Sequence, residues 1–196
     1  IPANAEKPID KRTVRYEKTH KVELKPFVKW VGGKGQLIEE IEKMLPSDGE
    51  KILTKYAEPM VGGGALLFNV ISRYQFDELY ISDINSELIN AYIAIKQDVE
   101  ALIERLNEMQ MTFLPLDENG RKYYYYNVRD KFNTVKLSDS TSTEKAAYFI
   151  FLNKTCFNGL FRVNRKGLFN VPMGSYKNPT ICDAENLRNI HGALQN

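Results

Sequence analysis

AEPMVGGGA, residues 57–65, is the segment that decides the fold. The short run before it, residues 52–57, is predicted to be a strand, and residues 65–74 resume the apolar spacing of a helix. Glycines between a strand and a helix can take up positive φ values and let the backbone approach a ligand closely. In open α/β sheets, ligands bind at the carboxyl ends of the strands, where this turn is expected. The alternative is a tight turn without a ligand, because short glycine motifs are weak signals.

Strands and helices alternate on both sides of this turn. Residues 36–45 have helical apolar spacing, and residues 78–82 (ELYIS) are a second predicted strand that ends before Asp83. Residues 86–106 are predicted to form one long amphipathic helix. Alternation of this kind predicts parallel strands joined by helical crossovers. The expected fold class is therefore α/β.

The alternation stops near residue 110. Residues 123–132 and 146–153 are predicted helices, and residues 157–171 contain a turn between two apolar stretches, which is typical of a β-hairpin. We therefore expect a mostly helical lobe that carries this hairpin and is set into the α/β part. The predicted parts are an N-terminal arm (1–25), a first α/β part (26–109), the lobe (110–182) and a return to the α/β part (183–196).

The composition excludes several classes of protein. With 43% hydrophobic residues in a chain of 196, there is enough apolar material for a core. No run approaches the roughly 20 apolar residues of a membrane span, and residues 1–25 lack the apolar core of a signal peptide. The two cysteines and two histidines are too scattered for a zinc site or a disulfide framework, so no metal is expected. Free thiols suit the cytoplasm, which is the predicted location.

Positive charge is concentrated in one part of the chain. The net charge is only +2, but residues 145–182 contain no Asp or Glu. The basic residues of this stretch are Lys145, Lys154, Arg162, Arg165, Lys166 and Lys177. A basic surface of this kind attracts a polyanion through counterion release. The alternative is a solvated basic face without a partner.

Two further positions could contribute to a ligand site near the glycine turn. Asp83 follows the second predicted strand, where a carboxylate can accept hydrogen bonds from ribose hydroxyls. The alternative is a helix N-cap, for which Asn85 is also suited. Trp30, the only tryptophan, lies in KWVGGK (29–34), where its indole could cover the apolar face of a cofactor while Lys34 meets a carboxylate. The alternative for Trp30 is an anchor that holds the turn to the core.

Taken in order, five blocks resemble the Dam-type DNA adenine methyltransferases, the alpha group of the D12 class. The blocks are KWVGGK (29–34), EPMVGGGA (58–65), DIN with LINAY (83–92), FLNKTCFNGLFRVN (151–164) and GLFNVPMGSYKNP (167–179). The resemblance implies a Rossmann-like methyltransferase sheet with an inserted DNA-recognition lobe, S-adenosyl-L-methionine as the cofactor and double-stranded DNA as the partner. The residues that it implies for cofactor binding are Trp30, Lys34, Glu58, Pro59, Gly62, Gly63 and Asp83.

The resemblance also implies that the predicted hairpin contacts DNA. Arg162 is suited to bidentate reading of a guanine in the major groove, and the family suggests GATC as the target. The other residues expected near the bases are Phe157, Asn158, Leu160 and, beside a thymine methyl group, Pro172. Those expected at phosphates, which position without specifying sequence, are Lys154, Arg165, Lys166 and Lys177. The alternative for the aromatic residues is core packing, above all for Phe161 and Phe169.

One block of the family is missing. Adenine-N6 methyltransferases of this kind use a [DNS]PP[YFW] motif, which stacks the flipped adenine on its aromatic ring and binds the amino group. None of the eight prolines is followed by a second proline. We therefore expect that the chain is cut short before this motif, carries none of its catalytic residues and transfers no methyl group alone. A C-terminal fragment on a second chain, or a longer protein, would supply the motif.

Two other hypotheses remain open. The first is a non-catalytic DNA-binding protein that retains the recognition lobe. The second is a nucleotide-binding fold with another substrate, which predicts no salt-dependent DNA binding, contrary to what the basic stretch suggests.

Overall fold

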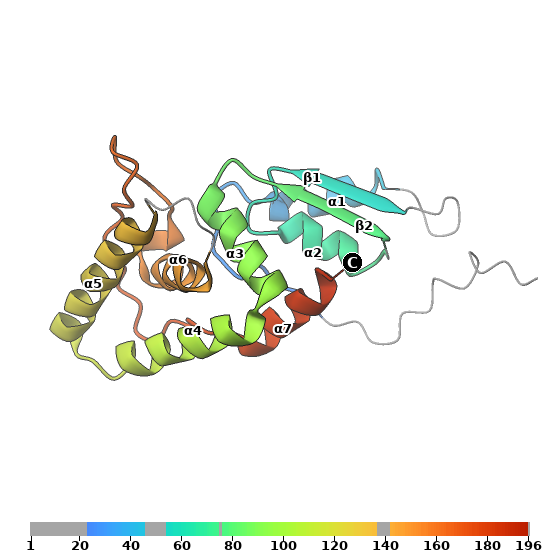
Figure 1. The fold of residues 1–196 in the computed structure, drawn as a ribbon. Coiled ribbons are helices and arrows are strands. Elements are labelled where there is room, and N and C mark those ends of the chain that lie inside the picture. The colour runs from blue at the N-terminus through green and yellow to red at the C-terminus, as the bar shows by residue number, and fades with distance from the viewer. Residues whose placement is uncertain (1–22, 46–53, 75, 137–141, 196) are drawn as a thin grey trace, which may run out of the picture.

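A computed structural model describes residues 23–45, 54–74, 76–136 and 142–195, so most of the predicted N-terminal arm lies outside the described residues. In chain order the elements are η1 (Lys34–Leu37), α1 (Ile38–Glu42), β1 (Lys55–Pro59), α2 (Ala65–Ile71), β2 (Glu78–Ser82), α3 (Ser86–Gln97), α4 (Val99–Phe113), α5 (Glu118–Lys136), α6 (Thr143–Thr155), η2 (Phe157–Gly159) and α7 (Ala184–Ala193). Figure 1 shows the two strands at one end of the molecule and α5 at the other.

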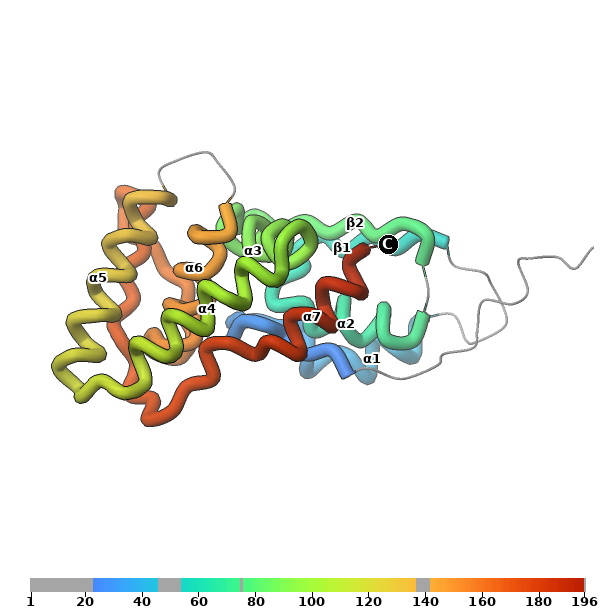
Figure 2. The backbone as a smooth tube through the Cα atoms, turned by 60° about the horizontal axis from the view of Figure 1, so that its bottom comes forward, coloured from blue at the N-terminus to red at the C-terminus, as the bar shows by residue number. Residues whose placement is uncertain are grey.

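The two strands form a small parallel sheet, which confirms the predicted strand direction and a mixed helix and strand fold. Lys55 lies opposite Glu78 and Pro59 lies opposite Ser82. The strands are joined through α2, which runs alongside them in Figures 1 and 2. Because the strands are parallel and in register, the glycine turn after β1 and Asp83 after β2 leave the sheet at the same edge.

The prediction of a single helix over residues 86–106 is wrong, because the helix is interrupted at Asp98. The backbone there has φ −150° and ψ 67°, which separates α3 from α4. The Asp98 carboxylate accepts a hydrogen bond from the amide of Ala101 at 3.3 Å and so caps α4. Aspartate competes for backbone donors in this way, which favours helix starts over helix interiors.

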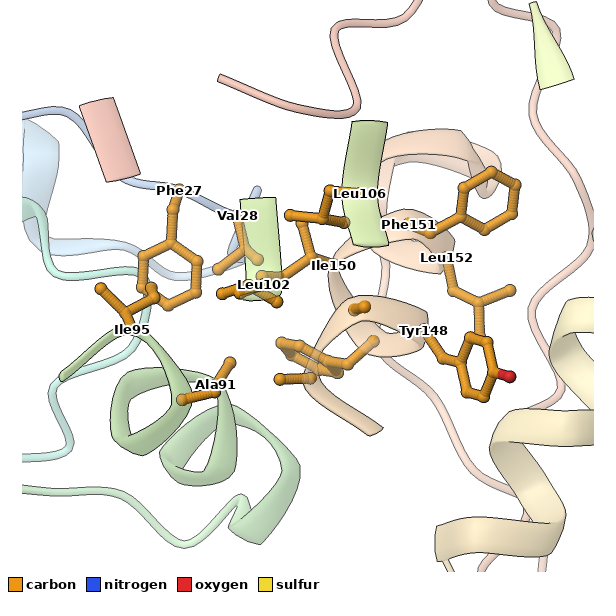
Figure 3. Packing of buried hydrophobic residues seen from close by; sticks show 14 of the residues in the cluster. Phe27, Val28, Ala91, Ile95, Leu102, Leu106, Tyr148, Ile150, Phe151 and Leu152 are labelled. Carbon is orange, nitrogen blue, oxygen red and sulfur yellow. The ribbon is translucent and has the colours of Figure 1, made fainter. Parts of the chain in front are cut away.

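The core is built around α6. Every residue from position 145 to 153 is buried, and the helix lies between α3, α4 and α5. Figure 3 shows its side chains Ile150 and Phe151 packed among residues from α3, α4 and the segment before Trp30. A helix that is apolar on nearly all sides is stable only when it is surrounded by other elements. This core is continuous across residue 110, so the predicted division into parts stays a prediction.

Residues 157–174 project beside α5 in Figure 1 without forming a regular strand. Two isolated antiparallel bridges, Cys156–Met173 and Val163–Phe169, hold the arms of this segment together. The tip is closed by Asn164, whose side chain accepts from the amides of Lys166 and Leu168 at 2.9 and 3.1 Å. The arms thus run antiparallel as a hairpin requires, while a β-hairpin with regular strands stays a prediction.

No helix in the described ranges has the length and apolar character needed to cross a membrane.

Candidate cofactor and nucleic-acid site

The glycine turn is shaped by close contacts that exclude side chains. Gly64 has φ +84°, and a Cβ atom there would lie 2.6 Å from the Phe68 ring and 2.6 Å from the Tyr92 hydroxyl. The turn is tied to the second strand because the amide of Val61 donates to the carbonyl of Ser82 at 2.9 Å. The backbone of this turn, which carries no side chains at its glycines, is therefore held in place at the edge of the sheet.

Trp30 lies directly against this turn. A Cβ atom at Gly62 would be 3.0 Å from Cδ1 of the indole, and one at Gly63 would be 3.2 Å from the Cβ of Trp30. A small cavity opens here, lined by Trp30 together with Lys34, Val61 and others. The indole also stacks on Phe161, with ring centroids 6.1 Å apart and an interplanar angle of 27°. Trp30 therefore both packs against the core and borders the cavity.

Lys34 and Glu58 form a largely buried ion pair beneath the cavity. The Nζ of Lys34 is 2.6 Å from Oε1 of Glu58 and donates to the Met60 carbonyl at 2.9 Å. The hydroxyl of Tyr56 donates to Oε2 of Glu58 at 2.8 Å. Burial, followed by the hydrogen bond and charge of Glu58, raises the pKa of the Tyr56 hydroxyl. The carboxylate that Lys34 meets in this structure is thus the protein's own.

Asp83 binds the glycine turn rather than capping α3. Its Oδ2 accepts from the amide of Gly62 at 3.0 Å, and its Oδ1 accepts from the amide of Asn85 at 2.9 Å. The N-cap of α3 is Asn85, whose side chain accepts from two amides of the first turn at 3.0 Å each. The N-cap alternative for Asp83 is therefore wrong.

Tyr92 completes this arrangement from α3. Its hydroxyl donates to the carbonyl of Gly62 at 3.0 Å. Burial, followed by the negative charges of Glu58 and Asp83, raises the pKa of this hydroxyl, so it remains a donor at neutral pH. Sequence reasoning did not assign a role to Tyr92 or Tyr56, although Tyr92 belongs to the LINAY block that carried the resemblance.

Six of the seven residues predicted for cofactor binding are joined by these contacts: Trp30, Lys34, Glu58, Gly62, Gly63 and Asp83. Pro59 ends β1 beside them and is exposed. An indole face, a bare backbone and two carboxylates at one sheet edge can bind a ligand that offers a flat ring, hydroxyl donors and a positive charge. In the described part of the chain, no group of three or more His, Cys, Asp or Glu residues could hold a metal ion.

The residues predicted to contact DNA lie mainly on the projecting segment. Those exposed are Phe157, Asn158, Arg162, Arg165, Lys166, Pro172 and Lys177. The guanidinium of Arg162 is held against Asn170, because its Nε donates to the Asn170 side chain at 2.8 Å and its Nη2 donates to the Asn170 carbonyl at 3.3 Å. Leu160 is half-buried, and Phe169 is packed in the core as its alternative reading predicted. A cleft of about 700 Å³ lies between α5 and residues 173–177, with Phe157 and Lys177 on its walls.

Two lysines of the basic stretch differ from the exposed group. Lys154 is half-buried, and burial, followed by the nearby charge of Lys29, lowers its pKa. Lys145 was expected to belong to a basic surface, but it is buried and its Nζ is 3.5 Å from Oε2 of Glu87. Its inclusion in the surface was wrong, because a buried ammonium needs a carboxylate partner and here obtains one from α3.

An α/β framework with a glycine turn and a carboxylate at one sheet edge, joined to a basic projecting segment, is the arrangement expected of an enzyme that pairs a nucleotide-type cofactor with a polyanionic substrate. The model of one protein family, D12 class N6 adenine-specific DNA methyltransferase, matches residues 30–196. The chain therefore belongs to this family of adenine-specific DNA methyltransferases.

Curated relatives are similar over most of this chain. Type II methyltransferase M.MjaIII of Methanocaldococcus jannaschii is 52% identical over 176 residues, which cover 89% of this chain and 61% of the relative. Type II methyltransferase M1.LlaDCHI of Lactococcus lactis subsp. cremoris is 40% identical over 90% of this chain and 57% of its own length. DNA adenine methylase of Vibrio cholerae is 40% identical over 81% and 51%. The chain thus spans between about half and three-fifths of the length of these relatives.

Proposed function

We propose that this chain supplies the S-adenosyl-L-methionine-binding and DNA-recognition parts of a site-specific DNA adenine-N6 methyltransferase with a GATC-type target. The observation that carries the proposal is the position of Trp30. Its side chain packs both against the glycine turn and against Phe161 of the projecting segment. The cofactor and the DNA would therefore bind to adjoining surfaces of one packed unit, as methyl transfer between them requires.

The residues at the sheet edge fit this cofactor. Asp83 keeps lone pairs beyond its two backbone bonds and would accept from the ribose hydroxyls. Gly62 and Gly63 present bare backbone where a side chain would meet Trp30, and the indole would cover the cofactor's flat face. Lys34 and Glu58 place opposite charges where the amino-acid end would bind. When bound, S-adenosyl-L-methionine supplies an electrophilic methyl group. The two-stranded sheet would be part of a larger Rossmann-like methyltransferase sheet.

Calorimetric titration with S-adenosyl-L-methionine tests the cofactor site. We expect wild-type protein to bind and Asp83→Asn to lose at least about tenfold in affinity, because a hydrogen bond to a charged group is worth about 1.5–3 kcal/mol. The exposed Glu104 on α4 provides a control, since Glu104→Gln also replaces one carboxylate by an amide, away from the glycine turn. Equal affinity in wild-type and Asp83→Asn proteins would remove Asp83 from the site.

DNA recognition is tested with duplexes that differ only in one GATC sequence. We expect Arg162→Ala to cost about 1–3 kcal/mol and to relax specificity at one guanine. Lys166→Ala, at the exposed tip of the same segment, should weaken binding to every duplex by the same factor. If Arg162→Ala weakens binding to all duplexes equally, Arg162 contacts phosphate instead.

Methyl transfer would need a segment that this sequence does not contain. Because none of its prolines is followed by another, no residue here can play the part of the [DNS]PP[YFW] motif. We expect tritium transfer to DNA only when a polypeptide bearing that motif is added to the chain. The exposed basic residues of the projecting segment would serve equally in a second candidate, a DNA-binding protein without catalysis, which predicts no transfer from the mixture. Transfer by the chain alone would refute both.

A further inference from the structure

The segment that leads to Trp30 is held by two asparagine side chains. The amide of Asn186 on α7 accepts from the backbone N–H of Lys25 at 3.0 Å and donates to the Lys25 carbonyl at 2.9 Å. The amide of Asn153 on α6 makes the same pair of bonds with Lys29, both at 2.8 Å. Each side chain thus pairs with one residue as a neighbouring strand would. Phe27, between these two points, is buried in the core (Figure 3).

Asn153 differs from Asn186 in making a third hydrogen bond. Its Nδ2 also donates to the carbonyl of Gly159 at 3.0 Å, and the residue is only 3% exposed. Both hydrogens of the amide are therefore used, one on the segment before Trp30 and one on the projecting segment. The loss of these bonds would therefore leave the carbonyls of Lys29 and Gly159 without their donor.

The two segments are also in van der Waals contact at this junction. Gly159 has φ +63°, and a Cβ atom there would lie 2.5 Å from the Cβ of Lys29. The Nζ of Lys29 lies 3.9 Å from the centre of the ring of Tyr176, two residues past the end of the projecting segment. Beyond Lys29, the indole of Trp30 stacks on Phe161. Three successive contacts thus fix the position of the projecting segment relative to the glycine turn.

We propose that Asn153 is a positioning residue that couples the cofactor turn to the DNA-recognition segment, so that binding of either ligand strengthens binding of the other. This inference rests on the proposed function. Because these contacts tie the two segments together, a ligand that favours one position of Trp30 also favours the matching position of Lys29 and, through Asn153, of the start of the segment that would meet DNA. The second ligand then meets the arrangement that it binds best, which gives positive cooperativity. By linkage, the factor must be the same in both directions.

The coupling factor is the ratio of cofactor affinities with and without a saturating GATC duplex, measured by calorimetry. We expect a factor of about 5- to 150-fold for wild-type protein, and a factor near one for Asn153→Ala. Asn186→Ala is the matched control, because it removes the equivalent pair of bonds at Lys25 and no bond to the recognition segment. Asn186→Ala should keep the wild-type coupling factor, even if it loses as much stability as Asn153→Ala.

A second variant addresses the junction without changing Asn153. Gly159→Ala forces the Lys29 side chain away from the projecting segment, and we expect it to lower the coupling factor as well. If Asn153→Ala does not fold, the coupling factor of Gly159→Ala tests the proposal in its place. The inference is overturned if wild-type protein binds both ligands without coupling, if the junction variants keep the factor, or if Asn186→Ala loses it too. If wild-type protein binds neither ligand, the proposed function itself fails.

Discussion

At the scale of single residues, the glycine turn depends on positions where a Cβ atom has no space. We expect Gly64→Ala to lower the free energy of unfolding by about 3 kcal/mol. Left-handed strain of about 1–2 kcal/mol adds to overpacking of about 1–3 kcal/mol, because φ is +84° and the new methyl group would meet both Phe68 and Tyr92. Urea denaturation measures the change.

Gly32 separates these two contributions. It has φ +77°, but no atom lies within 4 Å of a Cβ built there. Gly32→Ala should therefore cost only the strain, about 1–2 kcal/mol. Equal losses at Gly32 and Gly64 would contradict the packing argument.

Because the thiol of Cys156 is buried, the free energy of unfolding should vary with pH in the alkaline range. Burial raises its pKa to about 11, whereas an unfolded chain ionises near the ordinary value of about 8.5. The contribution of the neutral thiol to stability is complete below the pKa of the unfolded chain. It is lost as the pH rises through the pKa of the folded protein. Relative to Cys156→Ala, wild-type protein should lose about 3 kcal/mol between roughly pH 8 and pH 11. The ionising tyrosines are common to both proteins, so parallel stability profiles would refute this effect.

The sequence predicted that certain residues lie at one turn more readily than it predicted which of them pair with one another. The order of motifs correctly marked Lys34, Glu58 and Asp83 as neighbours of one turn, because strand ends in a parallel sheet share an edge. It did not show that Lys34 pairs with Glu58, since that contact depends on how η1 packs on β1. Asn153 had no signal of its own beyond its place in a matching block.

At the scale of elements, three helices meet at a buried ion cluster. Glu87 in the first turn of α3 lies 3.5 Å from Lys145 of α6 and 3.9 Å from Lys136 of α5, and all three side chains are mostly buried. Burial lowers the pKa of Lys136, against the opposing effect of Glu87. The single carboxylate of Glu87 is therefore the counter-ion of two largely buried lysines.

Breaking this cluster should be costly. We expect Glu87→Ala to lower the free energy of unfolding by about 3–5 kcal/mol, because it leaves Lys145 buried without a counter-ion. A double variant, Glu87→Leu with Lys145→Met, should recover much of the loss, since it leaves no uncompensated charge in place of this pair. Denaturation curves of the single and double variants measure both effects.

An exposed ion pair provides the control. Arg188 of α7 contacts Glu100 of α4 at 2.7 Å, and both side chains are more than half exposed. Glu100→Ala should leave the denaturation midpoint nearly unchanged, because solvent screens such pairs. A loss as large as that of Glu87→Ala would mean that burial is not what makes the Glu87 cluster matter.

Helix periodicity predicted the elements well and their interruptions poorly. Residues 86–106 keep an apolar stripe on both sides of Asp98, so periodicity could not reveal the break. The signal was the capping tendency of Asp98 itself, which is weak against such a long stripe. In residues 157–174, the turn at Asn164 was predictable from local preference, whereas the extent of strand pairing depends on packing against α5 and α6.

At the scale of the whole molecule, the distribution of charge matters more than its sum. The net charge is +2. Lys145 and Lys136 are largely buried and pair with Glu87, so their charges are mostly hidden from solvent. The basic residues left exposed between positions 160 and 180 are Arg162, Arg165, Lys166 and Lys177. A nearly neutral protein can therefore present a positive surface on one projecting segment, and its binding to DNA should depend steeply on salt.

The salt dependence gives a count of phosphate contacts. A plot of the logarithm of the DNA-binding constant against that of the salt concentration has a slope of about −0.9 for each phosphate neutralised. Lys166→Gln should therefore make the slope shallower by about 0.9 and weaken binding to all sequences alike. Lys43→Gln removes the same charge from the cofactor side of the molecule, where Lys43 pairs with Glu40 at 2.7 Å, and should leave the slope unchanged. If both variants shift the slope equally, the overall charge rather than the projecting segment attracts the DNA.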